Sequence, residues 1–290
     1  MPAYPDDLRE QVEEYLRTLE FSGRASTAGL REAMSYSLLA GGKRIRPVLC
    51  LAAARSTGAD PSTVLPLAAA IELIHTYSLI HDDLPAMDDD ELRRGRPTSH
   101  VVYGEDVAIL AGDGLFAEAI RHVCEHQEGE PERILNALGE LVAATGVEGM
   151  VGGQYVDVTA GDDLDEASLR ELHSLKTGKL IGASVTSPLV LAGLGEERMD
   201  PYRRFAAELG VLFQIVDDIL DVTGSDEELG KPQGSDERHG KLTYVSLLGL
   251  ERAREIASES HRAARDALAE ISGDATDLER IADFILERDS

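Results

Sequence analysis

Two clusters of aspartates in this sequence stand at the ends of strongly apolar segments. The first cluster runs from Asp82 to Asp90, and the second runs from Asp217 to Asp221. Asp217 and Asp221 are four residues apart, so a helix places both carboxylates on one face. Carboxylates that crowd the C-terminal end of a helix repel one another and the helix dipole unless a cation is present. The clusters therefore predict a site for a hard divalent cation with oxygen ligands, above all Mg²⁺.

The first cluster needs a break in its helix to act as one site. Asp82 and Asp88 are six residues apart, and an unbroken helix would rotate one from the other by about 240°. Pro85 lies between them and interrupts the helix, so the chain can turn Asp88 back toward Asp82. A solvated acidic face is the alternative for either cluster, because the chain contains 54 Asp and Glu residues. Two such clusters after apolar segments favour the metal site.

Basic residues are scarce, and several stand near these clusters. The chain has 28 basic and 54 acidic side chains and a net charge of −26, so the cations that hold an anionic substrate must be placed locally. Gly42, Lys43 and Arg46 belong to a glycine turn that leads into a helix, an arrangement that favours phosphate binding. Further cations follow the two clusters: Arg93, Arg94, Arg96, Lys231 and Lys241. Together these features predict a polyphosphate held between metal ions and basic side chains.

Composition excludes several other classes of function. A net charge of −26 argues against general nucleic-acid binding. The sequence has no uninterrupted apolar run of the roughly 18 to 20 residues that a membrane span needs, and its N-terminus does not resemble a secretory signal. Cys50 and Cys124 make no disulfide framework and fit a reducing compartment. We therefore expect a cytoplasmic chain without a membrane span.

The segments that must position these residues have helical patterns. Aromatic residues make up 4% of the chain and Trp is absent, so the core must consist mostly of Leu, Ala, Val and Ile. Apolar spacing and Gly or Pro breaks predict helices over 6–20, 27–40, 47–57, 64–83, 105–126, 131–146, 166–194, 201–223, 241–270 and 275–288. Segments 64–83 and 205–222 are apolar nearly all round, which indicates central positions. We expect an all-α fold in which residues 1–290 form a single domain, one large bundle of about ten or more helices.

These motifs resemble those of the trans-isoprenyl diphosphate synthases, the polyprenyl synthetase family. The stretch Ser78 to Thr98 is similar to the first aspartate-rich motif in the DDxxxxD form of bacterial farnesyl diphosphate synthases, and Asp217 to Asp221 is similar to the second. Other motifs fall in family order: Gly42 to Pro47, Gly153-Gln154, Lys176 to Gly178, and Gly230 to Lys241. The resemblance extends from about residue 30 to the C-terminus and implies the isoprenoid synthase fold, with helices around a central cavity.

The resemblance also implies a reaction and the residues that perform it. Isopentenyl diphosphate would condense head to tail with dimethylallyl or geranyl diphosphate, by ionisation, condensation and elimination. About three Mg²⁺ ions, with Mn²⁺ as a substitute, would bind Asp82, Asp83, Asp88, Asp217, Asp218 and Asp221. Isopentenyl diphosphate would bind Gly42, Lys43, Arg46, His75 and Arg94. The allylic diphosphate would bind Arg93, Lys176, Lys231 and Lys241. Lys176, Thr177 and Gln214 would stabilise the allylic cation.

Product length depends on the helix that ends at Asp82, because the growing hydrocarbon must run beside it and out of water. The expected chain-length pocket comprises Ile74, Tyr77, Ser78 and Phe116. In the family, an aromatic residue five positions before the first aspartate, together with the two extra residues of the DDxxxxD motif, goes with C15 products, so Tyr77 predicts farnesyl diphosphate. The small Ser78 keeps the C20 product, geranylgeranyl diphosphate, as the alternative. The resemblance also implies a homodimer.

More distant alternatives have specific sequence features against them. A terpene cyclase would replace the second aspartate motif by an Asn/Ser/Glu triad, and a non-catalytic prenyl synthase subunit would lose one of the motifs. A Ca²⁺-binding structural bundle would not account for the cations placed beside both clusters. The sequence keeps both aspartate motifs and these cations, which favours the synthase.

Overall fold

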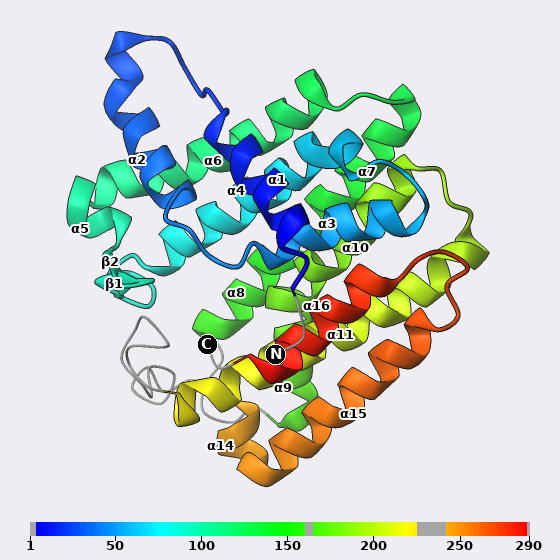
Figure 1. Cartoon of the computed structure of the whole chain (residues 1–290). Helices are drawn as coiled ribbons and strands as arrows, with labels where there is room; N and C mark the ends of the chain where they lie inside the picture. Colours follow the sequence, from blue (N-terminus) through cyan, green and yellow to red (C-terminus); the bar gives the residue numbers. More distant parts are fainter. Residues whose placement is uncertain (1–3, 160–164, 225–241, 289–290) are drawn as a thin grey trace.

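The computed structural model describes residues 4–159, 165–224 and 242–288, and this part of the chain is all-α, as predicted (Figure 1). The first helices are α1 (Asp6–Arg17), α2 (Ala28–Leu38), α3 (Ile45–Ser56), α4 (Leu65–Asp82), α5 (Ser99–Tyr103), α6 (Glu105–His126) and α7 (Pro131–Thr145). The remaining helices are α8 (Met150–Thr159), α9 (Glu166–His173), α10 (Lys179–Leu191), α11 (Glu196–Thr223), α14 (Tyr244–Leu248), α15 (Leu250–Leu268) and α16 (Thr276–Glu287). The strands β1 (Leu92–Arg93) and β2 (Arg96–Pro97) form a small antiparallel hairpin.

The helices share one hydrophobic core, with α4 at its centre. Helix α4 packs against α6 on one side and α3 on the other, and α1 lies across α3 and α4 (Figure 1). Most of its apolar side chains are buried, and Ile71, Leu73 and Ile74 are almost completely inaccessible. This burial agrees with the nearly uniform hydrophobicity of the segment in the sequence. The central helix ends at Asp82, so the core fixes where the first aspartate cluster begins.

The structure divides two of the predicted helices. Segment 166–194 is interrupted by a turn of π-helix at Ser174–Gly178, between α9 and α10. Segment 241–270 breaks at Gly249, whose φ of +83° belongs to the left-handed region that favours glycine. Helix α8 was not predicted, because the pair Gly152-Gly153 reads as a break in the sequence. These departures matter for function, since α8 and the π-turn both line the cavity described below.

Two segments of the described chain are long and apolar enough to cross a membrane by length and composition. They are Pro61–Asp82, of which 67% is buried, and Pro131–Thr159, of which 33% is buried. The first contains the core helix α4, and core helices of water-soluble proteins meet the same criteria. The two segments are therefore weak evidence for a membrane span.

Candidate active site

A cavity of about 740 Å³ lies between the end of α4, the β-hairpin, α8, the π-turn and α11. Its wall brings together most of the predicted site residues. The acids that line it are Asp82, Asp88, Asp90, Asp157, Asp217, Asp218 and Asp221. The cations are Arg46, Arg93, Arg94 and Lys176, and His75, Tyr77, Ser78, Thr177 and Gln214 complete the predicted set. The cavity thus combines carboxylates and cations, as the sequence predicted for a site that binds a diphosphate and metal ions.

Several predicted residues stand elsewhere. Gly42, Lys43, Ile74, Asp83 and Phe116 do not line the cavity in the described part of the chain. The predicted allylic ligands Lys231 and Lys241 lie outside the described residues.

The chain turns back immediately after α4, as the proline predicted. The backbone N–H of Asp88 donates to the carbonyl of Asp82 at 2.9 Å, and Asp89 adopts a left-handed backbone with φ +53°. Asp82 and Asp88 therefore face the same cavity. A continuous helix would point two residues six positions apart in different directions. The turn therefore allows both aspartates to contribute to one site.

Asp83, which was predicted to act at the metal site, does not line the cavity. Its side chain is buried, and Arg93 Nε donates to its Oδ1 at 2.7 Å. Burial raises the pKa of Asp83, and the Arg93 guanidinium offsets part of that rise. In this structure Asp83 therefore holds Arg93, which does line the cavity.

The second cluster lies on the unbroken helix α11. Asp218 is buried and accepts hydrogen bonds from the backbone N–H of Tyr244 and from Gln214 Nε2, both at 2.8 Å. The Oε1 of Gln214 in turn accepts from Thr177 Oγ1 at 3.1 Å. This chain of bonds fixes the orientation of the two polar residues that were predicted to stabilise an allylic cation. Asp217 is more exposed and pairs with Arg288 at 3.0 Å.

The donor set fits Mg²⁺ held jointly with a diphosphate. In the residues that the structure describes, no three His, Cys, Asp or Glu side chains stand close enough to hold an ion alone. The clusters instead face one cavity from two helices, and their carboxylate oxygens are the ligands that Mg²⁺ accepts together with substrate phosphates. Asp82 and Asp88 on one side, with Asp217 and Asp221 on the other, would hold the ions.

Arg46 and His75 line the cavity next to each other. Burial holds the pKa of His75 well below its usual range, and the nearby Arg46 lowers it further, so the imidazole is neutral. A neutral ring nitrogen can accept from Arg46, whose NH1 lies 3.4 Å from His75 Nε2. Burial also lowers the pKa of Arg46 to about 10, which leaves it charged at neutral pH. His75 thus orients a cation that faces the cavity.

Gly42 leaves space for the side chain of Arg94, because glycine has no Cβ atom. Its φ is +123°, and a Cβ there would lie 2.6 Å from the Cζ of Arg94. The NH1 group of Arg94 donates to the carbonyl of Gly41. The glycine therefore lets this guanidinium lie against the turn. Lys43 points elsewhere in this structure, with its ammonium 5.4 Å from the centre of the Phe284 ring.

Sequence reasoning missed two residues that contact the predicted site. Asp157 on α8 pairs with Lys176 at 2.6 Å, and its only sequence signal was its position three residues after the motif residue Gln154. Arg288, after α16, pairs with Asp217 at 3.0 Å and places its guanidinium carbon 4.4 Å from the centre of the Phe213 ring. A single Arg near the C-terminus carries no local signal for such a role.

Tyr77 forms part of the cavity wall five residues before Asp82. Its ring lies edge-on to Phe116, at 5.4 Å between centroids, and to His81, at 5.8 Å. The His81 Nε2 lies 3.0 Å from the carbonyl of Ile109 on α6, which ties the end of α4 to its neighbour. Ile74 is fully buried and lies outside the cavity lining. Tyr77 and Ser78 therefore face the cavity, and Phe116 packs behind Tyr77.

Comparison with known proteins identifies the family of this chain. Residues 27–284 match the polyprenyl synthetase family. The large subunit 1 of a heterodimeric geranylgeranyl pyrophosphate synthase from Arabidopsis thaliana is 48% identical, over 89% of this chain and 72% of its own length. A geranylgeranyl pyrophosphate synthase from Capsicum annuum is 49% identical, over 90% of this chain and 72% of its own length.

Solved structures give the same family. A geranyltransferase from Legionella pneumophila superposes with a TM-score of 0.87 at 34% identity, over 98% of this chain and 95% of that one. A geranyltransferase from Helicobacter pylori, solved with magnesium and isoprenyl diphosphate, gives 0.85 at 33% identity, over 97% and 94%. With two aspartate clusters and a set of cations around one cavity, this chain belongs to the polyprenyl synthetase family, the trans-isoprenyl diphosphate synthases, and is a prenyl diphosphate synthase.

Proposed function

We propose that this enzyme makes farnesyl diphosphate, by condensing isopentenyl diphosphate with dimethylallyl and then geranyl diphosphate in the presence of Mg²⁺. The observation that carries the C15 product is the place of Tyr77. Its ring stands in the cavity wall just over one helical turn before Asp82, where a growing chain would pass. Phe116 and His81 pack against the ring, so it has little room to rotate away.

The residues of the chain have separate tasks in this reaction. Arg93 and Lys176 hold the allylic diphosphate, and Arg46 and Arg94 hold isopentenyl diphosphate. Mg²⁺, when bound, neutralises the charge that develops on the departing diphosphate. Thr177 and Gln214 present oxygen dipoles to the allylic cation, in the orientation fixed by Asp218. Such preorganised groups lower the barrier because they need not reorient as charge develops.

Geranylgeranyl diphosphate is the second candidate product. The relatives from Arabidopsis and Capsicum are named as geranylgeranyl pyrophosphate synthases, and they are about half identical to this chain. Ser78, beside Tyr77 in the cavity wall, is small and would leave space for a longer tail. The size of the Tyr77 ring decides between the two products in this proposal.

The test is product analysis with labelled isopentenyl diphosphate, each allylic starter in turn, and Mg²⁺. We expect C15 from the wild type and C20 or longer from Tyr77→Ala, because the truncated side chain no longer closes the wall. Tyr77→Phe is the matched control, since it keeps the ring and should keep C15. A wild type that makes mainly C20, or an active Tyr77→Ala variant that still stops at C15, would contradict the role given to Tyr77.

We further propose a homodimer. The neighbouring helices α6 and α7 expose apolar side chains, with Leu110 54% and Leu135 68% accessible, and Val147 just after α7 is 80% accessible. Exposed apolar groups of this kind favour association. Light scattering coupled to size-exclusion chromatography should give twice the chain mass of 31.3 kDa for the wild type. The double variant Leu110→Glu with Leu135→Glu should have the mass of a single chain. A monomeric wild type would contradict the proposal.

A further inference from the structure

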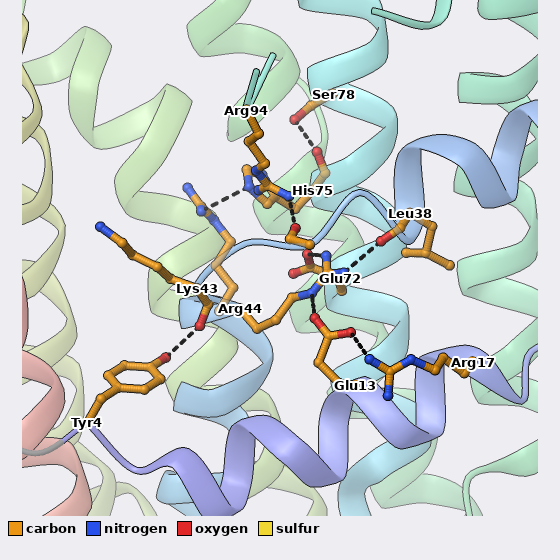
Figure 2. A network of polar contacts seen from close by, with 12 residues as sticks. Tyr4, Glu13, Arg17, Leu38, Lys43, Arg44, Glu72, His75, Ser78 and Arg94 are labelled. Atoms are coloured by element: carbon orange, nitrogen blue, oxygen red, sulfur yellow. Dashed lines mark hydrogen bonds and ion pairs between the residues drawn. The ribbon is translucent and has the colours of Figure 1, made fainter. Parts of the chain in front are cut away.

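Arg44 lies in the middle of the phosphate-binding motif yet points away from the cavity. Its side chain is almost inaccessible, and all three guanidinium nitrogens have partners. Nε donates to Glu13 at 2.7 Å, NH1 to Glu72 at 2.5 Å, and NH2 to the carbonyl of Leu38 at 2.7 Å. Figure 2 shows these contacts, with Lys43 extending to the other side of the turn. Arg44 therefore ties the glycine turn to α1, α4 and the end of α2.

The backbone of Arg44 is as unusual as its side chain. With φ 53° and ψ 36° it occupies the left-handed region, which non-glycine residues rarely adopt. This conformation comes directly before the first residue of α3 and between Lys43 and Arg46. It directs the Arg44 side chain into the protein interior while Arg46 faces the cavity. A conformation of this kind persists only where the surrounding contacts fix it.

Glu72 links the same contact to α4, the helix that carries His75. It lies on α4, three residues before His75, so both side chains share one face of that helix. His75 contacts Arg46, as described above, while Glu72 contacts Arg44. The turn and α4 are thus joined at two adjacent points, one buried and one in the cavity. The charge of Glu72 also favours the protonated forms of Arg46 and Arg94, against the burial that lowers their pKa values.

From this arrangement we propose that Arg44 and Glu72 are positioning residues for isopentenyl diphosphate. Their buried pair holds the turn in the conformation that aims Arg46 at the substrate. The inference rests on the proposed function, specifically on the assignment of Arg46 to the isopentenyl diphosphate pocket. It predicts that loss of the pair weakens binding of this one substrate and spares the allylic diphosphate, whose ligands lie on other elements.

A contact of the same kind at the other end of α3 provides the matched control. Arg55 pairs with Asp7 at 2.6 Å and with Asp277 at 2.9 Å, and so ties the last turn of α3 to α1 and α16. It is an arginine on the same helix, held between two acids, but it lies outside the cavity lining. A purely structural role would make the two arginines equivalent in their effect on substrate binding.

The central variant is Arg44→Met combined with Glu72→Met. Removing one partner alone would leave a buried charge without compensation, whereas replacing both by apolar side chains often preserves stability. Glu13 keeps a partner in this variant, because Arg17 lies 3.5 Å from it. We expect the KM for isopentenyl diphosphate to rise about tenfold or more, which corresponds to about 1.4 kcal/mol of binding. The KM for the allylic substrate and kcat should change by less than about twofold.

Steady-state kinetics with each substrate varied, together with thermal melting, separates the outcomes. Arg55→Met should lower the melting temperature and leave both KM values unchanged. Glu13→Gln, which keeps a hydrogen bond to Arg44, should raise the KM for isopentenyl diphosphate by less than the double variant. A folded double variant with unchanged KM for isopentenyl diphosphate would overturn this inference alone, and so would equal changes in both KM values. A wild type without condensation activity would overturn the proposed function and this inference with it.

Discussion

The two aspartate clusters carry the same carboxylate groups, but the backbone that positions them differs. The first stands where α4 has ended and the chain turns back through Pro85, whereas the second lies on the continuous helix α11. In each, the second residue of the Asp-Asp pair is buried and bonded within the protein. Asp83 accepts from Arg93, and Asp218 accepts from the backbone of Tyr244. The comparison shows that the buried aspartate differs between the pairs: Asp83 lies outside the cavity lining, whereas Asp218 both lines the cavity and anchors the groups around it.

The clusters also differ in the origin of their cations. Arg93 comes from the hairpin ten residues after Asp83, so the first cluster and its cation form one local unit. Arg288 reaches Asp217 from 71 residues further along the chain. The first cluster therefore depends on a turn, and the second depends on the packing of α11 against α16.

The largest expected effect tests what the clusters share. Asp82→Ala and Asp217→Ala should each lower kcat by about 10²–10³-fold or more, because each removes a group that supports charge in the transition state. Chelation of Mg²⁺ by EDTA should abolish turnover. Asp113→Ala, on the exposed face of α6, is the control and should retain activity. Near-normal kcat in either cluster variant would remove that cluster from the metal site.

A smaller effect separates the two buried aspartates. Asp218→Asn should lower the free energy of unfolding by about 1–3 kcal/mol, because an amide cannot accept from both Tyr244 N–H and Gln214 without presenting a donor to a donor. Asp83→Asn should lower it by about 1 kcal/mol, since Arg93 keeps Asp90 at 3.7 Å. Denaturant unfolding measures both changes. A larger loss for Asp83→Asn would reverse our ranking of the two contacts.

The two cations should affect different ligands. Arg93→Met should raise the KM for the allylic diphosphate several-fold, because it removes a cation from the cavity wall. Arg288→Met should instead lower the Mg²⁺ concentration for half-maximal activity, by about three- to fivefold, since Asp217 no longer has a competing cation at 3.0 Å. Titrations of each variant with substrate and with Mg²⁺ distinguish the two. If both variants change only the allylic KM, Arg288 acts on the diphosphate rather than on Asp217.

The smallest effect is a pH dependence of stability from His173, which lies beside the π-turn in the cavity wall. Burial lowers its pKa to about 4, below the usual value of 6.5. As the pH falls, the unfolded chain therefore binds a proton at His173 before the folded chain does. The stability that the neutral ring contributes is complete above about pH 6.5 and is lost as the pH falls toward 4. Between pH 7 and pH 6 the loss is about 0.7 kcal/mol. His173→Gln should flatten the unfolding profile by that amount, and an unchanged profile would mean that the ring is protonated in the folded chain.

Hydropathy alone located most of the helices, because a buried helix must place apolar residues at helical spacing whatever it packs against. Segment 105–126 was predicted with the bounds that α6 has in the structure. The same pattern failed at the π-turn, where one extra residue per turn leaves the apolar spacing of segment 166–194 almost unaltered. The pattern also failed at α8, because Gly152 and Gly153 weaken the helical signal in the sequence. Gly153 is needed for close packing, since a Cβ there would lie 2.2 Å from the backbone nitrogen of Lys176.

The sequence by itself determined the all-α class, the position of both aspartate clusters and the chemistry of a diphosphate site, because residue type and short-range spacing dictate these. Only the tertiary structure decided which side chains face the cavity and which are used within the protein. Asp82 and Asp83 are adjacent in sequence, yet one lines the cavity and the other is buried against Arg93. The pairings of Lys176 with Asp157 and of Arg44 with Glu72 were likewise invisible in the sequence. Each joins elements that meet only when the helices pack, and the energy of an ion pair depends on that distance and burial rather than on position along the chain.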